Sequence, residues 1–477
     1  MRMPNRSILA SSRLTPIAAC VAAVLALATP AAMAATTWTV NTCADDNSGS
    51  TSAHTGTLRY TVFNAVTGDT IDMTGLTCST ISLVTGAIVV NEDALTWNGP
   101  TAGHLVVRNG QSPASDRVVN HQGTGLLYIE NISIANGNVI DSGANVYGGC
   151  IYSRGNVELS HVVVQSCSAT TSHSAYGGAI FTKGDLSVKY STISGGKATG
   201  ENALGGGAFV GGGLFVESSS IQGNSATSSA SGVVPIGTKF GEGGGLYLQG
   251  GAYITASTIS GNNARLAGGI MSYSGSPGST TVTIANSTIS ENSASAYVGG
   301  IFSNTSVTLE NSTIAYNTAV RGKTIGNFPA AAGLDLLTGA SITVNLQSAL
   351  IASNTYGSTN LDFSAETRAD EGGTGGSLTI TGHNNLIRVI AATTAKPPGT
   401  LQSCPLLGPL RNNGGPTATH ALMSHSPAID AGNNSAGFTD DQRGPPYLRT
   451  SGTAADIGAY EVQQADIIFN SGFDGCP

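Results

Sequence analysis

Short runs in which hydrophobic and polar residues alternate recur along the chain, separated by glycine, asparagine and serine. The phrase "STISGNNARLAGGI", residues 257 to 270, is followed by the near copies "STISENSASAYVGGI" and "STIAYNTAV". Such alternation is typical of β-strands, because successive side chains of a strand point to opposite faces. Leucine, alanine, glutamate and lysine are sparse at helical spacing, so we expect an all-β protein.

A Gly-Gly phrase marks each repeat, as "YGGCIYS", "YGGAIFT", "LGGGAFV", "GEGGGLYL", "LAGGIMS", "YVGGIFS" and the degenerate "AAGLDLL". Successive phrases lie 24 to 38 residues apart. Periods in this range indicate solenoids, whereas a propeller blade needs four antiparallel strands and about 40 residues. We therefore predict a right-handed parallel β-helix with N- and C-terminal caps, in which each coil pairs with the preceding coil.

An asparagine follows an isoleucine by three residues in five consecutive repeats. The members of this column are Asn224, Asn262, Asn292, Asn317 and Asn354. Side-chain amides satisfy backbone groups at turns, and stacked copies form hydrogen bonds along the stacking axis. We predict that this column is structural.

An aromatic residue or its substitute follows an aliphatic residue in each Gly-Gly phrase. The aromatic members are Tyr152, Phe181, Phe209, Tyr247 and Phe302. If the aliphatic residues face the core, the aromatic residues form an outward ladder that would bind sugar rings by stacking; the opposite orientation makes them an interior stack. Asp335 occupies the seventh rung, where burial without a partner would be costly, and this favours the outward orientation.

The first 34 residues have the features of a signal peptide. Arg2, Arg6 and Arg13 precede an apolar run, and the motif Ala-Met-Ala at residues 32 to 34 predicts cleavage after Ala34. The alternative is lipidation at Cys20, because "IAAC" resembles a bacterial lipobox. We expect an exported protein, extracellular or associated with the outer membrane at the cell surface.

The charge of the chain argues against nucleic acid as a partner. Cleavage would change the formal net charge from −8 to −11, and no basic stripe offsets it. No other segment has the 18 or more apolar residues of a membrane span, so we expect no span in the mature chain.

Six cysteines remain after the predicted cleavage, an even number that favours disulfides in an exported chain. Their grouping suggests the pairs Cys43 with Cys78, Cys150 with Cys167 and Cys404 with Cys476, although other pairings are open. No CxxC or histidine-rich spacing indicates a metal, and we expect no cofactor.

Three segments resemble known families. The repeats of residues 130 to 355 resemble those of polymorphic outer-membrane proteins, with "GGAI" at residues 177 to 180 and IxxN in place of FxxN, which implies a surface-displayed β-helix, often adhesive. "TGTLRYTVFNAVTGDTIDM" resembles the opening segment of CSLREA-motif proteins through Leu58 and Arg59, although Gly56 and Tyr60 replace its cysteine and glutamate, and this implies a cap. "NNGGPTATHALMSHSPAIDAG", with "DQRGPP" and "ADIGAYE", is similar to the choice-of-anchor Q domain, which implies a terminal module.

These observations predict five segments. They are the signal peptide at 1–34, an N-terminal cap with the first coils at 35–100, β-helix repeats at 101–400, a choice-of-anchor Q-like module at 401–462 and a tail at 463–477. In the module, the polar residues His420, His425, Asp430, Asp440, Asp441, Arg443, Asp456 and Glu461 are expected to close loops by hydrogen bonds rather than to bind a cation.

Catalysis is the alternative function, because pectate lyases and polygalacturonases share the β-helix fold. A lyase needs a base beside carboxylates, and a hydrolase needs paired carboxylates. The candidates are Arg154, Lys183, Arg321, Lys323, Asp335, Asp362 and Glu366, which form no lyase or hydrolase motif. We expect a non-catalytic scaffold with an adhesive or carbohydrate-binding role, whose partner is a polysaccharide or a cell-surface protein.

Overall fold

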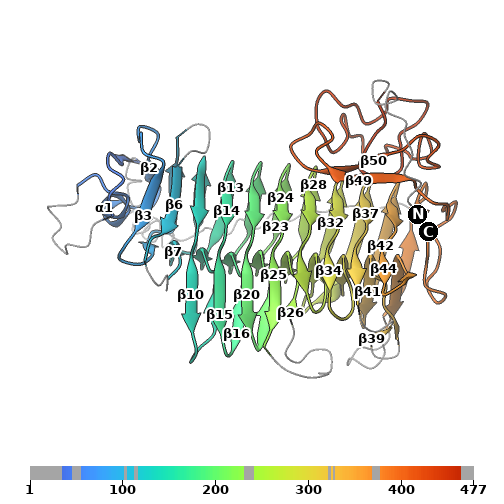
Figure 1. The fold of residues 1–477 in the computed structure, drawn as a ribbon, viewed down its shortest axis with the longest axis horizontal. Helices are drawn as coiled ribbons and strands as arrows, with labels where there is room; N and C mark the ends of the chain where they lie inside the picture. Colours follow the sequence, from blue (N-terminus) through green and yellow to red (C-terminus); the bar gives the residue numbers. More distant parts are fainter. Residues whose placement is uncertain are drawn as a thin grey trace, which may run out of the picture.

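The computed structural model describes residues 35–45, 55–100, 105–111, 116–229, 241–320, 324–325, 328–367 and 376–463. Within them the chain winds as a right-handed parallel β-helix, whose strands lie side by side along one long axis (Figure 1). The predicted fold class is confirmed. The predicted signal peptide and residues 464–477 of the tail lie outside the described residues. No helix in the described part of the chain is long and apolar enough to cross a membrane.

Three long sheets enclose the lumen of the helix. Sheet A comprises β1 (Thr37–Thr39), β2 (Thr70–Asp72), β5 (Leu95–Asn98), β8 (Leu126–Glu130), β13 (Asn156–Ser160), β18 (Leu186–Lys189), β23 (Leu214–Glu217), β28 (Ala252–Thr255), β32 (Thr281–Ala285), β36 (Ser306–Glu310), β42 (Ile342–Gln347) and β47 (Leu378–Thr381). Sheet B comprises β3 (Thr80–Leu83), β6 (Leu105–Asn109), β9 (Ile132–Ala135), β14 (Val163–Gln165), β19 (Thr192–Ser194), β24 (Ser220–Gln222), β29 (Thr258–Ser260), β33 (Thr288–Ser290), β37 (Thr313–Ala315), β43 (Leu350–Ala352) and β48 (Leu386–Ile387). Sheet C comprises β4 (Ile88–Val90), β7 (Val119–His121), β12 (Ile151–Ser153), β17 (Ile180–Thr182), β22 (Ala208–Val210), β27 (Leu246–Leu248), β31 (Ile270–Ser272), β35 (Ile301–Ser303), β41 (Leu334–Thr338) and β46 (Phe363–Thr367).

Two further sheets form a fin beside the lumen. Sheet D comprises β10 (Asn138–Asp141), β15 (Ser168–Thr171), β20 (Lys197–Gly200), β25 (Ser225–Ser228), β30 (Asn263–Ala264), β34 (Ser293–Ala294), β38 (Thr318–Ala319), β44 (Thr355–Tyr356) and β45 (Thr359–Asn360). Sheet E comprises β11 (Val146–Tyr147), β16 (Ser174–Tyr176), β21 (Asn202–Leu204) and β26 (Gly241–Glu242). Small buried residues such as Ala169, Ala175, Ala198 and Ala203 pack between them, so the fin is thin.

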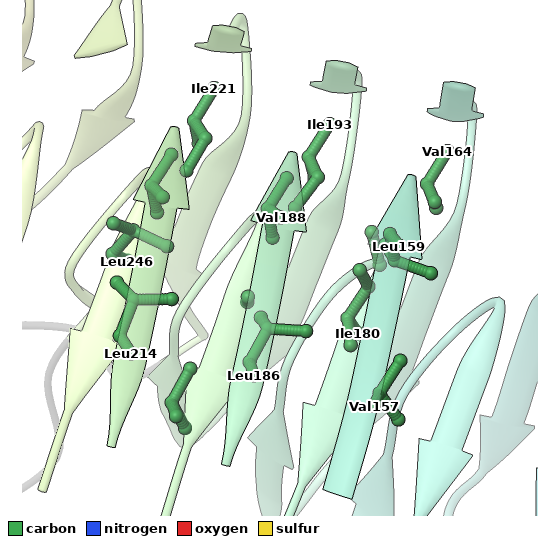
Figure 2. Packing of buried hydrophobic residues seen from close by; sticks show 14 of the residues in the cluster. Val157, Leu159, Val164, Ile180, Leu186, Val188, Ile193, Leu214, Ile221 and Leu246 are labelled. Carbon is green, nitrogen blue, oxygen red and sulfur yellow. The ribbon is translucent and has the colours of Figure 1, made fainter. Parts of the chain in front are cut away.

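The lumen is filled by aliphatic side chains stacked in register. Val157, Leu186 and Leu214 occupy equivalent positions on successive strands of sheet A, and Figure 2 shows the same repetition for Val164, Ile193 and Ile221 on sheet B. All are buried. Because the period of a strand is two, the residues between them face outward and are free to vary.

A narrow neck joins the lumen to the fin, and the two repeated phrases of the sequence meet there. In the asparagine column, Nδ2 of Asn262 donates to Oδ1 of Asn292 at 2.9 Å and to the carbonyl oxygen of Ile221 at 2.9 Å. The next members continue the ladder to Asp362, whose Oδ1 accepts from Asn354 at 2.9 Å. Each asparagine is at most 1% exposed, so its amide groups are satisfied within the protein.

Glycine is required on the opposite side of the neck because the two chain segments approach closely. A Cβ atom added to Gly245 would lie 3.1 Å from Nδ2 of Asn262, and one added to Gly269 would lie 3.2 Å from Nδ2 of Asn292. A Cβ atom on the preceding glycine of either phrase, Gly244 or Gly268, would collide with backbone atoms. The repeated Gly-Gly phrase is therefore a consequence of the neck.

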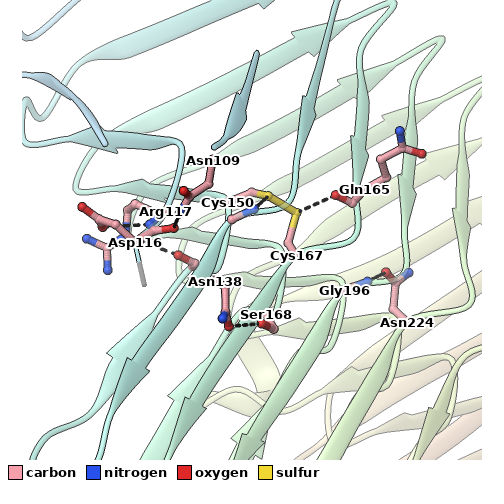
Figure 3. The surroundings of a disulfide bond; sticks show 12 residues. Asn109, Asp116, Arg117, Asn138, Cys150, Gln165, Cys167, Ser168, Gly196 and Asn224 are labelled. Atoms are coloured by element: carbon pink, nitrogen blue, oxygen red, sulfur yellow. Dashed lines mark hydrogen bonds between the residues drawn. A yellow bond between two sulfur atoms is a disulfide. The ribbon is translucent and has the colours of Figure 1, made fainter. Parts of the chain in front are cut away.

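A disulfide replaces this contact near the N-terminal end of the neck. Cys150 occupies the position that Gly245 has in a later coil. Cys167 and Gly196 occupy the position of the asparagine column in the two coils before Asn224. The amide of Gly196 donates to Oδ1 of Asn224 at 2.8 Å (Figure 3). The predicted bond between Cys43 and Cys78 is also present. The predicted third pair includes Cys476, which lies outside the described residues.

The N-terminal end of the lumen is covered by α1 (Leu58–Asn64), whose Leu58 and Val62 join the lumen core. Thr57 caps this helix by accepting from the amide of Tyr60. Arg59 lies 2.8 Å from Asp45 and donates to the carbonyl groups of Gly86 and Ala87. These bonds attach the helix to the first coils.

The C-terminal module predicted at residues 401–462 packs beside the β-helix rather than over its end. The hairpin of β49 (Leu407–Arg411) and β50 (Thr419–Leu422) and the loops that follow it pack along the outer flank of sheet B (Figure 1). At this end of the lumen, Ile390 forms an isolated bridge to Phe363 and Leu401 forms one to Leu386, and Ile387 and Ile390 pack in or against the lumen core. Two kinds of contact place the C-terminal segment on sheet B. Thr258, Thr288 and Thr313 point out from sheet B and bond to the C-terminal segment, and Leu350 and Ala352 of the same sheet share a buried hydrophobic cluster with it.

The remaining elements are short. They are the 3-10 helix η1 (Pro277–Ser279) and the antiparallel pair of β39 (Thr324–Ile325) and β40 (Phe328–Pro329).

Candidate functional site

A groove crosses the outer face of sheet A over β8, β13, β18, β23 and β28. Its volume is about 410 Å³. It is lined by Leu126, Asn156, Val157, Glu158, Asp185, Leu186, Ser187, Gly213, Leu214, Phe215, Gly251 and Ala252. This size is in the range of small-ligand sites.

Strand register creates the hollow. Glu158, Ser187, Phe215 and Tyr253 are paired neighbours in one outward column across four strands. The small side chain of Ser187 leaves space between Glu158 and Phe215. Gly213 and Gly251 line a second part of the groove without any side chain.

Phe215 lines one side of the groove, and Tyr253 of the next strand lies behind it. The rings of Phe215 and Tyr253 stack with centroids 6.0 Å apart and an interplanar angle of 8°. Tyr253 is 40% exposed. Tyr253 contacts one side of Phe215, and the other side is turned toward Ser187 and the hollow, where Nζ of Lys189 lies over the ring. A sugar ring that stacks on this side would share it with Lys189.

Charged and polar groups surround this wall. Nζ of Lys189 lies 2.7 Å from Oε1 of Glu158 and 5.6 Å from the centroid of the Phe215 ring. The hydrogen bond that Lys189 donates to Glu158 raises the pKa of Lys189 above its ordinary value, although burial opposes this change. Lys189 is therefore a stable cation rather than a proton acceptor at neutral pH.

Asn156, the first residue of β13, and Asp185, the residue before β18, have side chains that are held by backbone hydrogen bonds. Oδ1 of Asn156 accepts from the amide of Asp185 at 2.8 Å, and Oδ1 of Asp185 accepts from the amide of Gly213 at 2.6 Å. These bonds fix the two side chains beside the hollow, where their remaining polar atoms are available to hydroxyl groups of a ligand.

The aromatic column predicted from the repeats lies on sheet C and faces away from the lumen. Ile151, Ile180 and Leu246 are fully buried inside the lumen, as the outward alternative requires. Consecutive aromatic rings stack, with centroids 5.5 Å apart for Tyr152 and Phe181. The column continues with 5.3 Å between Phe181 and Phe209 and 5.2 Å between Phe209 and Tyr247.

The fin covers much of this column, however. Phe209, Tyr247 and Phe302 are only 4 to 6% exposed and belong to a second hydrophobic cluster outside the lumen. Stacking of sugar on these three rings is therefore corrected to interior packing. The two orientations considered from the sequence were burial in the lumen and exposure to solvent. Neither included burial in a second hydrophobic core outside the lumen, which the fin provides.

The first two aromatic rungs are half-buried. The guanidinium group of Arg117 lies over the ring of Tyr152, 5.3 Å from its centroid. The ring centroids of Phe181 and Tyr147 lie 4.9 Å apart. Their ring faces are largely occupied by protein groups, so we place no ligand there.

The candidate catalytic residues do not assemble into one site. Arg154 and Lys183 are exposed on turns between sheets C and A, whereas Asp335 and Asp362 are buried in the last coils. Glu366 is partly buried on β46. Arg321 and Lys323 lie outside the described residues.

The polar residues of the C-terminal segment form internal ion pairs. Arg443 lies 2.7 Å from Asp441, and Arg449 lies 2.9 Å from Glu461, with all four side chains buried. His420 is also buried, and its Nε2 lies 2.7 Å from Oγ of Ser290. Among the described residues, no group of three or more histidine, cysteine, aspartate or glutamate side chains is arranged to hold a metal ion.

Sequence reasoning missed the groove on sheet A. Its signal is present in "GLFVESSS" and "GAYITAS", where Phe215 and Tyr253 alternate with buried aliphatic residues. The alternation places both rings on the outer face, but their adjacency depends on the pairing of β23 with β28.

Comparisons with known proteins yield a structural similarity alone. No family model matches the chain, and no curated protein matches it. The three family resemblances therefore remain predictions. Among solved structures, the crystal structure of pectate lyase Pel9A is similar, with 13% sequence identity, a TM-score of 0.45, and coverage of 89% of this chain and 96% of that chain. We draw nothing about ligand or activity from this similarity.

Proposed function

We propose that this protein is an exported β-helix scaffold that binds carbohydrate in the groove on sheet A. The observation that carries the proposal is the stacked pair of Phe215 and Tyr253 beside Asn156, Glu158 and Asp185. An aromatic face with adjacent hydrogen-bonding groups is suited to sugar rings, which have an apolar face and a hydroxyl-bearing edge.

The location proposed is the cell surface or the surrounding medium. Two disulfides support an oxidising compartment. The long rows of serine, threonine and asparagine on the outer strands support a surface built for contact with hydrated partners. Residues 1–34 would direct export.

Binding is favoured over lyase cleavage by the state of Lys189. A lyase base must lose its proton near neutral pH, whereas the contact with Glu158 raises the pKa of Lys189. Arg154 and Lys183, the bases suggested by the sequence, do not line the groove.

The test is depletion of the purified protein from solution by a panel of insoluble polysaccharides. We expect the wild type to be retained by at least one of them, and Phe215→Ala with Tyr253→Ala to lower the association constant roughly 10-fold or more, since aromatic contacts at ligand sites contribute about 1 to 3 kcal/mol. Sugar released into solution is measured in the same samples.

Tyr190→Ala is the matched control. Tyr190 is 51% exposed and stacks on His161, but it lies on the turn after sheet A rather than in the groove. Its substitution is expected to leave retention unchanged. Retention of the double variant at the wild-type level would refute the groove assignment, and release of sugar by the wild type would establish catalysis instead.

A further inference from the structure

We propose that the groove on sheet A selects glycan strands without carboxylate, sulfate or phosphate groups and therefore disfavours polyuronates. This inference rests on the proposed carbohydrate binding and names the class of glycan.

The charges that line the groove carry the inference. Glu158 and Asp185 are its charged lining residues, and both are acidic. Asp185 accepts from the amide of Gly213, a neutral partner, and forms no ion pair with another described residue. An anionic sugar at the Phe215 wall would therefore lie beside carboxylates of the protein.

The nearby cations do not reverse this balance. Lys189 is paired with Glu158 at 2.7 Å and has Glu217 as its direct neighbour on the next strand. Its single charge is thus shared between two carboxylates. Arg154 and Lys183 lie on exposed turns two residues before Asn156 and Asp185, outside the lining of the groove.

The hydrogen-bonding capacity of the lining carboxylates also favours glycans without acidic groups. The carboxylates of Glu158 and Asp185 only accept, whereas sugar hydroxyl groups donate. A glycan with free hydroxyl groups satisfies these acceptors, and a protonated amino group satisfies them with a charge-assisted bond. A uronate carboxylate offers them no donor.

The test compares polymers that share a backbone and differ at the carboxyl group, which is charged in one member and neutral in the other. Suitable pairs are polygalacturonate with its fully methyl-esterified form, alginate with its carboxyl-reduced form, and hyaluronan with its carboxyl-reduced form. We expect the neutral member of each retained pair to bind roughly 5-fold more tightly or better at low salt, with a smaller difference at high salt.

The outcomes separate this inference from the proposed function. Equal or stronger binding of the acidic members would overturn the charge selection while leaving carbohydrate binding intact. Failure of every polymer in the pairs and in the earlier panel would overturn both.

Asp185→Asn assigns the selection to the groove. The amide oxygen of asparagine still accepts from Gly213, so the turn is expected to persist while one negative charge is lost. We expect binding of the acidic member to increase about 5-fold and that of the neutral member to change less than 2-fold.

Asp141→Asn is the control, because Asp141 also accepts a backbone amide, from Gly143 at 2.8 Å, but is exposed on sheet D. It alters the net charge equally and is expected to leave the difference between members unchanged. An equal effect of both variants would show that net charge, not the groove, sets the preference, and an unchanged difference in Asp185→Asn would also overturn the assignment.

Discussion

At the scale of single residues, the buried carboxyl groups of the last coils lower the stability of the fold by an amount that depends on pH. Asp335 is 1% exposed, and burial raises its pKa to about 8, although the amide of Ala331 donates to its Oδ1. Burial likewise raises the pKa of Asp362 to about 6, where it terminates the asparagine ladder. Both groups therefore hold a proton in the folded state at a pH at which the unfolded chain has released it.

The sign of the effect follows from proton binding. Between about pH 4 and pH 8 Asp335 binds more protons in the folded state than in the unfolded state, so its contribution makes stability fall as pH rises through this window. We expect the wild type to be less stable at pH 8 than at pH 5, with a slope of at most about 1.4 kcal/mol per pH unit for Asp335.

Asp335→Asn is expected to reduce this slope and to raise the urea midpoint at pH 8 more than at pH 5. Denaturation at both pH values measures it. Asp72→Asn, at a surface carboxylate that accepts from Thr74, is the control and should leave the slope unchanged. A variant at Asp335 with the wild-type slope would contradict a neutral buried carboxyl group.

At the scale of elements, the neck holds the fin against the lumen. The asparagine ladder, the glycine column and the disulfide of Cys150 with Cys167 occupy successive coils of the same corner. Strands of sheets B, D and C enter this corner, so its hydrogen bonds fix the direction in which the chain leaves one sheet and joins the next.

Asn292→Ala is expected to lower the free energy of unfolding by about 2 to 4 kcal/mol. It removes the partners of Asn262 and Asn317 and leaves buried amide groups unsatisfied. Asn263→Ala is the control, because Asn263 lies on the exposed face next to the ladder and should change stability by no more than about 0.5 kcal/mol. Equal losses in the two variants, measured by urea denaturation, would argue against the ladder as a source of stability.

At the scale of the whole molecule, the C-terminal segment ties several coils together from outside. Asn286, Asn311 and Ser348 lie at one corner of three coils and bond to Asp440 or Asn433. In a solenoid each coil otherwise contacts only its neighbours, so a segment that spans several coils couples their unfolding.

Gln442 is the central polar residue of this attachment. Its side chain is fully buried, accepts from Oγ1 of Thr288 at 2.5 Å and donates to Oγ1 of Thr258 at 2.9 Å. We expect Gln442→Ala to loosen the segment, accelerate proteolysis between residues 388 and 404, and increase amide exchange in β29 and β33.

Gln402→Ala is the comparison variant, since Gln402 is exposed and accepts a hydrogen bond from Lys396 rather than from sheet B. It should leave proteolysis and exchange at wild-type rates. Proteolysis of the Gln442 variant at the wild-type rate would show that the segment is held mainly by its apolar contacts, such as Leu407 and Ile457.

The sequence by itself determined the coil. Its period, its alternation of aliphatic and polar residues and its asparagine and glycine phrases are local properties, and they identify a parallel β-helix because stacked coils place equivalent residues in register. Only the tertiary structure decided what covers each outer face. The aromatic residues of sheet C are buried by the fin, the C-terminal segment lies on sheet B, and sheet A remains open with a hollow at Ser187. Alternation tells which side chains leave the lumen, but whether they meet solvent depends on segments tens of residues away, and local pattern carries no information about such contacts.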